Sequence, residues 1–383
     1  MRFLVFFAIF FSVYGAANYY VFVRGRLFFP AGSWAGTVYL PVFLLMALAY
    51  PAGRMIERYV INVATGLLVG LGSLWLAALL YFVISLGLID LGRALVRLAG
   101  FQLPGSGSRL ATATAATVCS VIFLAVAGGA INARIPRLRT FEIDIPLRGR
   151  PAPSLPTPLV LAVATDIHIG HTMGAEKLGR IVDLLNATDP DVIFLVGDTV
   201  DEDLGPVLKR DLGKKLLQIR SRLGVFAVTG NHEYIGGVEN ACRYLEAHGV
   251  RMLRDAFVEA EGLCIIGRED PSVRWMTSRD RVALSTLIEQ AKPEGPVILL
   301  DHQPFHLEQA AESRIDFQLS GHTHHGQLWP LNFVTGLIYE NDWGYLRKSG
   351  TQYYVSCGAG TWGTPVRTSS RPEVLVIRVR FTP

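Results

Sequence analysis

Four long runs without a charged residue constrain the first part of this chain more than any other feature. A helix of about 20 apolar residues is long enough to cross a bilayer. Packed in a soluble helical domain, four such runs in 133 residues would leave little polar surface. The sequence therefore predicts a bundle of about four transmembrane helices, with spans near Phe3–Val23, Trp34–Ala52, Val60–Ile89 and Leu110–Ala133.

The charges around these runs agree with membrane flanks. Residues 1–133 hold eight arginines, no lysine and two acids, so eight minus two gives a net charge of +6. Arginines that alternate with long apolar runs are typical of membrane flanks, so we expect no nucleic-acid binding. Because the interiors of the spans carry no charge, we interpret them as an anchor rather than a transporter. The alternative for the first run is a signal peptide cleaved near Gly15-Ala16-Ala17.

The composition changes after the fourth run. Residues 1–139 are the predicted anchor, and residues 140–157 hold a half-exposed edge strand and a Pro-rich connector. From residue 158 to residue 383, short apolar strand patterns alternate with helical patterns, including an expected helix at 206–222. This alternation predicts an α/β domain, in which ligands gather at the carboxyl ends of strands.

Polar clusters follow five of the predicted strands. Asp166 and His168 lie two residues apart at the end of one strand, so their side chains point to the same side. The other clusters are Gly197-Asp198, Gly230-Asn231-His232-Glu233, His302, and Gly321-His322-Thr323-His324. Each cluster alone is common, but together they offer mixed nitrogen and oxygen ligands that suit Mn, Fe or Zn rather than calcium. Two such ions about 3.5–4 Å apart can hold a hydroxide and clamp a phosphate.

The order of these five clusters resembles the calcineurin-like metallophosphoesterase superfamily over roughly residues 158–381. The blocks GNHEY, DHQP and GHTHHGQ are most similar to its membrane-anchored subfamily, which includes the transmembrane protein with metallophosphoesterase domain and the UDP-diacylglucosamine pyrophosphatase group. The resemblance implies a four-layer αββα sandwich of two facing mixed sheets, following the transmembrane bundle.

The resemblance also implies roles for individual residues and two divalent metal ions, Mn, Fe or Zn. The first ion would be bound by Asp166, His168 and His324. The second would be bound by Asn231, His302 and His322, and Asp198 would bridge both ions. His232 would donate a proton to the leaving oxygen or stabilise the phosphoryl charge.

Two residues depart from the subfamily pattern, and one segment is unusual. His325 stands where the pattern has glycine, and it either touches substrate or metal or is simply tolerated. Cys357 stands where an arginine able to hold phosphate is expected. The apolar segment Leu328–Tyr339 is either a hairpin packed on the core or a lip that receives an acyl chain or touches the bilayer.

These observations predict a hydrolase of phosphoric esters that uses a metal-bridged hydroxide. The expected substrate is a phosphodiester or pyrophosphate, including lipid-linked ones, because the anchor holds the site near a membrane. The alternatives are a tethered phosphatase of soluble nucleotides or phosphoproteins, and a non-catalytic membrane scaffold. Eight arginines in the inner segments and connector against five in the outer loops predict a multi-pass protein of the cell membrane with a cytoplasmic catalytic domain.

Overall fold

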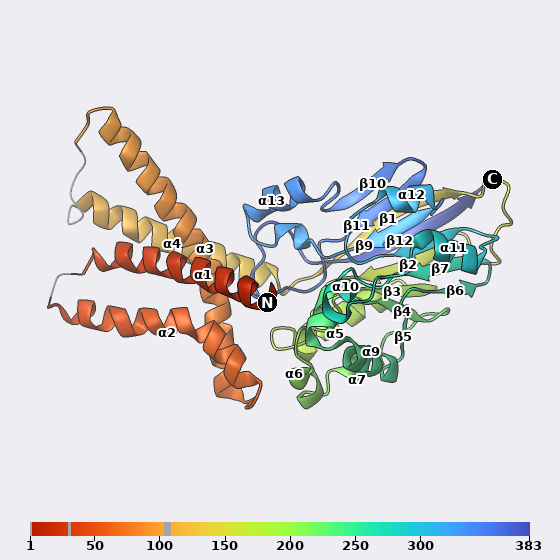
Figure 1. The fold of residues 1–383 in the computed structure, drawn as a ribbon, viewed down its shortest axis with the longest axis horizontal. Coiled ribbons are helices and arrows are strands. Elements are labelled where there is room, and N and C mark those ends of the chain that lie inside the picture. The colour runs from red at the N-terminus through yellow and green to blue at the C-terminus, as the bar shows by residue number, and fades with distance from the viewer. Residues whose placement is uncertain (1, 30–31, 103–108) are drawn as a thin grey trace. The chain divides into compact units, whose positions relative to one another are not determined.

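The computed structural model describes residues 2–29, 32–102 and 109–383, which divide into two compact units, one ending at Gly129 and one beginning at Ala130 (Figure 1). The first unit is helical. Its helices are α1 (Arg2–Arg26), α2 (Trp34–Glu57), α3 (Val63–Leu98) and α4 (Arg109–Asn132), and the last three residues of α4 belong to the second unit. The predicted domain boundary at residue 139 stays a prediction.

Three helices among the described residues, α2, α3 and α4, are long and apolar enough to cross a membrane. The predicted first span lies in α1, which is not among these three, so the number of four spans stays a prediction. Helix α3 continues to Leu98, beyond the span end predicted at Ile89. The predicted span ended where the charged Asp90 interrupts the apolar run, but a single charged residue does not end a helix. The Asp90 carboxylate accepts a hydrogen bond from the Tyr20 hydroxyl at 2.6 Å.

The second unit contains two six-stranded mixed sheets. In spatial order, the first sheet consists of β1 (Arg137–Pro146), β12 (Glu373–Thr382), β2 (Leu159–Ala164), β3 (Val192–Val196), β4 (Val225–Val228) and β5 (Val250–Met252). The second consists of β10 (Gly344–Lys348), β11 (Thr351–Val355), β9 (Phe317–Ser320), β8 (Val297–Leu300), β7 (Leu263–Gly267) and β6 (Ala256–Ala260). Strands β2 to β5 are mutually parallel, as are β7, β8, β9 and β11.

Helices and short turns connect these strands. They are α5 (Ala175–Asn186), α6 (Leu204–Lys209), α7 (Gly213–Leu216), α8 (Asn231–Gly236), α9 (Val238–Ala247), α10 (Ser272–Thr277), α11 (Leu284–Ala291), α12 (Glu308–Glu312), the 3₁₀ turn η1 (His324–Gly326) and α13 (Leu331–Ile338).

Alternating side chains along the strands build a layered core. In β3, Phe194 points into a buried cluster shared with Ile298 and Leu319 of the second sheet, so the two sheets face each other. Its neighbour Ile193 points the other way, into a cluster with Ile181 of α5. On the outer side of the second sheet, α11 packs in a third cluster. The predicted α/β sandwich of two mixed sheets flanked by helices is confirmed.

One expectation about local structure is wrong, and one of two alternatives is excluded. The helix expected at 206–222 is broken into α6 and α7, because Asp211 between them adopts a φ of 51°, which a right-handed helix does not allow. The segment Leu328–Tyr339 is not a hairpin: residues Leu331–Ile338 form α13.

Candidate metal centre

The predicted site residues lie in loops that follow strands of both sheets. Asp166 and His168 follow β2, and Asp198 follows β3. Asn231 and His232 begin α8, directly after the β4 loop. From the second sheet come His302 after β8, and His322 and His324 after β9. The carboxyl ends of these parallel strands meet at one edge, which brings residues distant in sequence together.

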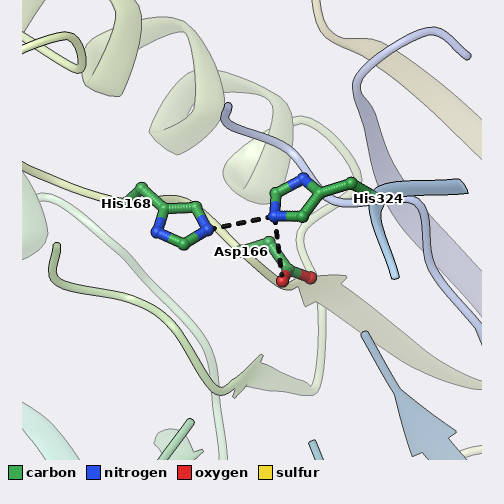
Figure 2. Close-up of side chains that lie close together, drawn as sticks. All are labelled: Asp166, His168 and His324. Carbon is green, nitrogen blue, oxygen red and sulfur yellow. Dashed lines mark hydrogen bonds and ion pairs between the residues drawn. The ribbon is translucent and has the colours of Figure 1, made fainter. Parts of the chain in front are cut away.

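Asp166, His168 and His324 form the first group (Figure 2). The Nε2 atoms of His168 and His324 face each other at 3.1 Å, and His324 Nε2 lies 3.5 Å from Asp166 Oδ1. All three side chains are buried. Two imidazole nitrogens and a carboxylate oxygen that converge in a buried space form a donor set suited to a divalent transition ion.

Asp198, His302 and His322 form the second group. His302 Nδ1 lies 2.8 Å from the carbonyl oxygen of Val196, and because a carbonyl only accepts, the imidazole carries its proton on Nδ1. Its other ring nitrogen, Nε2, lies 3.2 Å from Asp198 Oδ2. The same Oδ2 lies 3.9 Å from His168 Nε2, so Asp198 stands between the two groups.

Asn231 lies beside the second group. The backbone N–H of its neighbour His232 donates to Asp198 Oδ1 at 2.8 Å. Among the described residues, the buried atoms Asn231 Oδ1 and His302 Nε2 have no hydrogen-bond partner. A buried polar atom without a partner costs about 1–3 kcal/mol, and a bound cation would remove that cost. The residues of this site therefore fit divalent metal ions.

The backbone at the site adopts conformations that are uncommon outside glycine. Asp166, His168, Asp198, His322 and His324 all have φ between 48° and 72°. Such left-handed residues are a few per cent of non-glycine positions, with Asp and His enriched among them. At Gly197, with φ of 79°, an added Cβ would overlap the His302 imidazole. The loops thus turn sharply so that side chains from successive strand ends reach a common centre.

Burial shifts the pKa values of three candidate ligands, two in the first group and one in the second. Burial, helped by the nearby Asp198 charge, raises the pKa of Asp166 to about 6. Burial and the charge of His232 lower the pKa of His168 to about 4. Burial and the charge of His302 lower the pKa of His322 to about 3. At neutral pH these carboxylate and imidazole groups are deprotonated, which is the state in which they bind metal.

Glu233 joins the loops after β3 and β4. Its buried carboxylate accepts hydrogen bonds from the backbone N–H groups of Asp198 at 3.1 Å, Val200 at 2.9 Å and Gly230 at 2.8 Å. These three bonds hold Asp198 and the start of α8 in place. Glu233 therefore positions the site rather than contributing a metal-facing oxygen.

His232 is buried next to both groups, close to His168 and Asp198. Its Nδ1 lies 3.2 Å from Asp201 Oδ1 and 3.7 Å from Glu202 Oε1. Burial would lower the pKa of His232, but the negative charges of Asp198, Asp201 and Glu202 outweigh burial and raise the pKa to about 9. A carboxylate on Nδ1 leaves the opposite nitrogen free to give a proton to a bound group.

Sequence reasoning missed Arg367, which is fully buried. Its Nη2 donates to His324 Nδ1 at 2.9 Å, and its Nη2 and Nε both donate to the carbonyl oxygen of Gly360. Its Nη1 donates to Ser370 Oγ at 2.8 Å. Nothing in the local pattern around Arg367 marks it as different from a surface arginine, because its partners lie elsewhere in the sequence.

The two departures from the subfamily pattern occupy different surroundings. His325 has a φ of 47°, a conformation that suits the usual glycine, and its Nδ1 contacts Asp342 Oδ2 at 2.8 Å. This contact links His325 to the loop that contains Asp342. Among the described residues, His325 belongs to none of the groups of side chains that could hold a metal ion. Cys357 is buried, and its thiol donates to the carbonyl oxygen of Arg371 at 3.1 Å. Burial raises the pKa of this thiol to about 12.

We expect Arg367→Gln to weaken metal binding by roughly 10- to 100-fold, the usual effect of losing a partner that orients a ligand. The shorter amide cannot reach Gly360 and Ser370 as well as His324. The effect is measured by titrating metal into the detergent-solubilised chain after a chelator has removed its metal. The variant Arg367→Lys keeps the positive charge but loses the planar guanidinium. Unchanged metal affinity in this variant would show that the charge of Arg367, and not its orienting hydrogen bonds, supports metal binding.

Comparisons with known proteins agree with this geometry. A family model described as calcineurin-like phosphoesterase matches residues 159–326. The "Transmembrane protein with metallophosphoesterase domain" of Danio rerio is 34% identical over 310 residues, which are 77% of this chain and 69% of that protein. The protein of the same name from Bos taurus is 32% identical over 72% of this chain and 64% of its own length. An uncharacterized metallophosphoesterase of Aquifex aeolicus is 31% identical over 68% of this chain and 98% of its own length.

The chain thus spans about two thirds of the length of the first two relatives. The predicted likeness to the named transmembrane proteins is confirmed. The likeness to the UDP-diacylglucosamine pyrophosphatase group stays a prediction.

Proposed function

Because the chain belongs to the calcineurin-like phosphoesterase family, and is therefore a metal-dependent hydrolase of phosphoric esters, we propose that it cleaves a phosphodiester or pyrophosphate with two divalent ions. The observation that carries this proposal is the place of Asp198. Its Oδ2 lies 3.2 Å from His302 Nε2 and 3.9 Å from His168 Nε2. A single carboxylate between two donor groups suits a bridging ligand.

Each side chain has a separate task in this proposal. The first ion would be held by Asp166, His168 and His324, the second by Asn231, His302 and His322, and both by Asp198. When bound, divalent ions activate water and neutralise the charge of phosphoryl oxygens. His232 holds a proton near the leaving oxygen, and Asp201 orients its imidazole.

We propose that the substrates include lipid-linked phosphoesters. Three helices of the first unit have the length and hydropathy of membrane spans, and two relatives are named transmembrane proteins. An enzyme anchored this way meets membrane-borne substrates at high local concentration, which supports a phosphoester with a lipid part. The seven converging side chains argue against a non-catalytic scaffold, which has no use for such a donor set.

The test is a substrate and metal panel with the purified full chain. We expect chelation to abolish activity and reloading with Mn, Fe or Zn to restore it. The panel contains bis-p-nitrophenyl phosphate, p-nitrophenyl phosphate and lipid pyrophosphates. Preference for the monoester would favour a phosphatase of soluble substrates. A chain that binds metal but hydrolyses none of these compounds would favour the scaffold.

We also predict that the second unit faces the cytoplasm from the cell membrane. Arg134, Arg137 and Arg139 follow α4 directly, and positive residues next to a span favour the cytoplasmic side. Fusions of green fluorescent protein and of alkaline phosphatase after Pro383 measure the orientation. We expect a fluorescent first fusion and an inactive second fusion. The reverse pair of results would place the unit outside and redirect the search to extracytoplasmic phosphoesters.

A further inference from the structure

Helix α13 in the second unit turns its hydrophobic side chains outward. None of its residues is buried. Phe333 is 63% exposed, Leu337 88% and Ile338 58%, and Trp329 just before the helix is 51% exposed. An ordinary surface helix turns its polar face to water and its apolar face to the core, so this helix has the opposite arrangement.

Polar contacts hold α13 in this orientation. Thr335 Oγ1 donates to Asp342 Oδ2 at 2.7 Å, and the same carboxylate oxygen contacts His325 Nδ1 at 2.8 Å. Tyr339 N–H caps the end of the helix on the carbonyl oxygen of Thr335 at 2.9 Å. Through Asp342, the polar side of α13 is therefore linked to His325 of η1. The apolar side of the helix faces outward.

A basic pocket of about 650 Å³ lies in the same unit. Three exposed arginines, Arg137, Arg139 and Arg371, line it together with a single acid, Glu373. Glu373 is buried and lies 3.6 Å from Arg139, so three positive charges against one negative charge leave the pocket cationic. Such a pocket suits an anionic group such as a phosphate.

The pocket and α13 adjoin each other. Thr368, which lines the pocket, accepts a hydrogen bond at its Oγ1 from the Trp329 N–H at 2.9 Å. Trp343, on another wall of the pocket, packs against His325 in a tilted arrangement with ring centroids 4.9 Å apart. The exposed apolar residues of the α13 region and the three pocket arginines therefore form one surface, which we call the docking surface.

The chemistry of the docking surface points to one occupant. An apolar helix beside cationic side chains suits an anionic bilayer, where acyl chains and phosphate groups lie at neighbouring depths. A free phosphate would explain the pocket but not the helix. Asn132, which lines the pocket, is also the last residue of α4, a helix apolar enough to span a membrane. The five residues from Asn132 to Arg137 can extend at most about 18 Å, so the pocket stays close to the end of that helix.

We propose that the docking surface seats the second unit on an anionic lipid bilayer. The side chains of Phe333, Leu337 and Ile338 enter the boundary between headgroups and acyl chains, and the pocket arginines bind lipid phosphates. Because α13 follows η1, which carries His324, docking places the metal centre beside the lipid surface. This inference does not depend on which phosphoester the centre cleaves.

The test uses the full chain reconstituted in liposomes of phosphatidylcholine with or without phosphatidylglycerol. Leu337→Cys carries an environment-sensitive fluorophore in a Cys119→Ser background, in which the remaining cysteines are buried. Glu294→Cys, at an exposed position between α11 and β8, is the matched control. In anionic liposomes we expect nitroxide lipids to quench the label at position 337 at least about twofold more than the label at 294. Aqueous iodide should show the opposite order.

The arginine part is tested with the double variant Arg137→Gln, Arg371→Gln. We expect the difference between anionic and neutral liposomes to disappear in this variant. Equal iodide quenching at positions 337 and 294 in anionic liposomes overturns the proposal. The proposal is also overturned if the label at position 337 loses its protection from iodide when the chain is diluted into excess lipid. Dilution separates chains from one another, so that result would make a second copy of the chain the occupant. If the label at position 337 is protected from iodide equally in neutral and in anionic liposomes, the proposed role of the arginines is overturned.

Discussion

Replacing Asp198 with asparagine should abolish turnover and reduce bound metal. Asp198 Oδ2 lies between His302 Nε2 and His168 Nε2, and its other oxygen accepts the His232 N–H at 2.8 Å. Asparagine keeps the size and can keep this last hydrogen bond, but it removes the negative charge shared by two cations. Since several kcal/mol of charge stabilisation are lost, we expect a rate decrease of roughly 10³-fold or more.

Metal analysis by mass spectrometry and steady-state kinetics on the same preparation measure both parts of this result. Asp183→Asn is the matched control, because Asp183 is exposed on α5 and undergoes the same chemical change. The control should keep full metal content and full rate. An Asp198→Asn chain with full metal content and a normal rate would contradict the two-metal proposal.

His232→Ala should lower turnover by about 10²–10⁴-fold while leaving metal content intact, the usual scale for a lost proton transfer. The imidazole is oriented by Asp201, whose Oδ1 lies 3.2 Å from Nδ1, and nearby carboxylates raise its pKa to about 9. A protonated His232 can assist a poor leaving group. The loss should therefore shrink for p-nitrophenyl esters, whose leaving group needs little protonation.

A series of aryl phosphodiesters with graded leaving groups measures this dependence. His306→Ala is the control, because the His306 side chain is 66% exposed and pairs with Glu308 on the surface. The control should match the unaltered chain for every ester. An equal loss across the series in His232→Ala would instead assign this residue to binding or structure.

Local patterns in the sequence were enough to predict the strand ends that carry the site. Asp166, Asp198 and His302 each follow a short apolar run, and these runs form β2, β3 and β8. Strand formation and the turn after it depend mainly on neighbouring residues, so such features can be predicted one at a time. The likeness to a known family then grouped the candidate ligands, a step that spacing alone did not provide.

The unpredicted parts depend on contacts between distant segments. His168 and His324 meet across 156 residues, and Arg367 becomes a buried partner of His324 only when β12 and the loop before it complete the first sheet. The break between α6 and α7 was missed because the conformation of a single residue, Asp211, decides it.

By itself the sequence determined the apolar helices, the α/β class and the chemical types of the site residues, because hydropathy and strand patterns are properties of short segments. Only the tertiary structure decided which atoms face one another and which way α13 turns. The sequence left open whether the apolar segment Leu328–Tyr339 packs on the core or faces outward. In the structure, Thr335 donates a hydrogen bond to Asp342 and no residue of α13 is buried. That orientation is set by partners outside the segment, and no local pattern contains them.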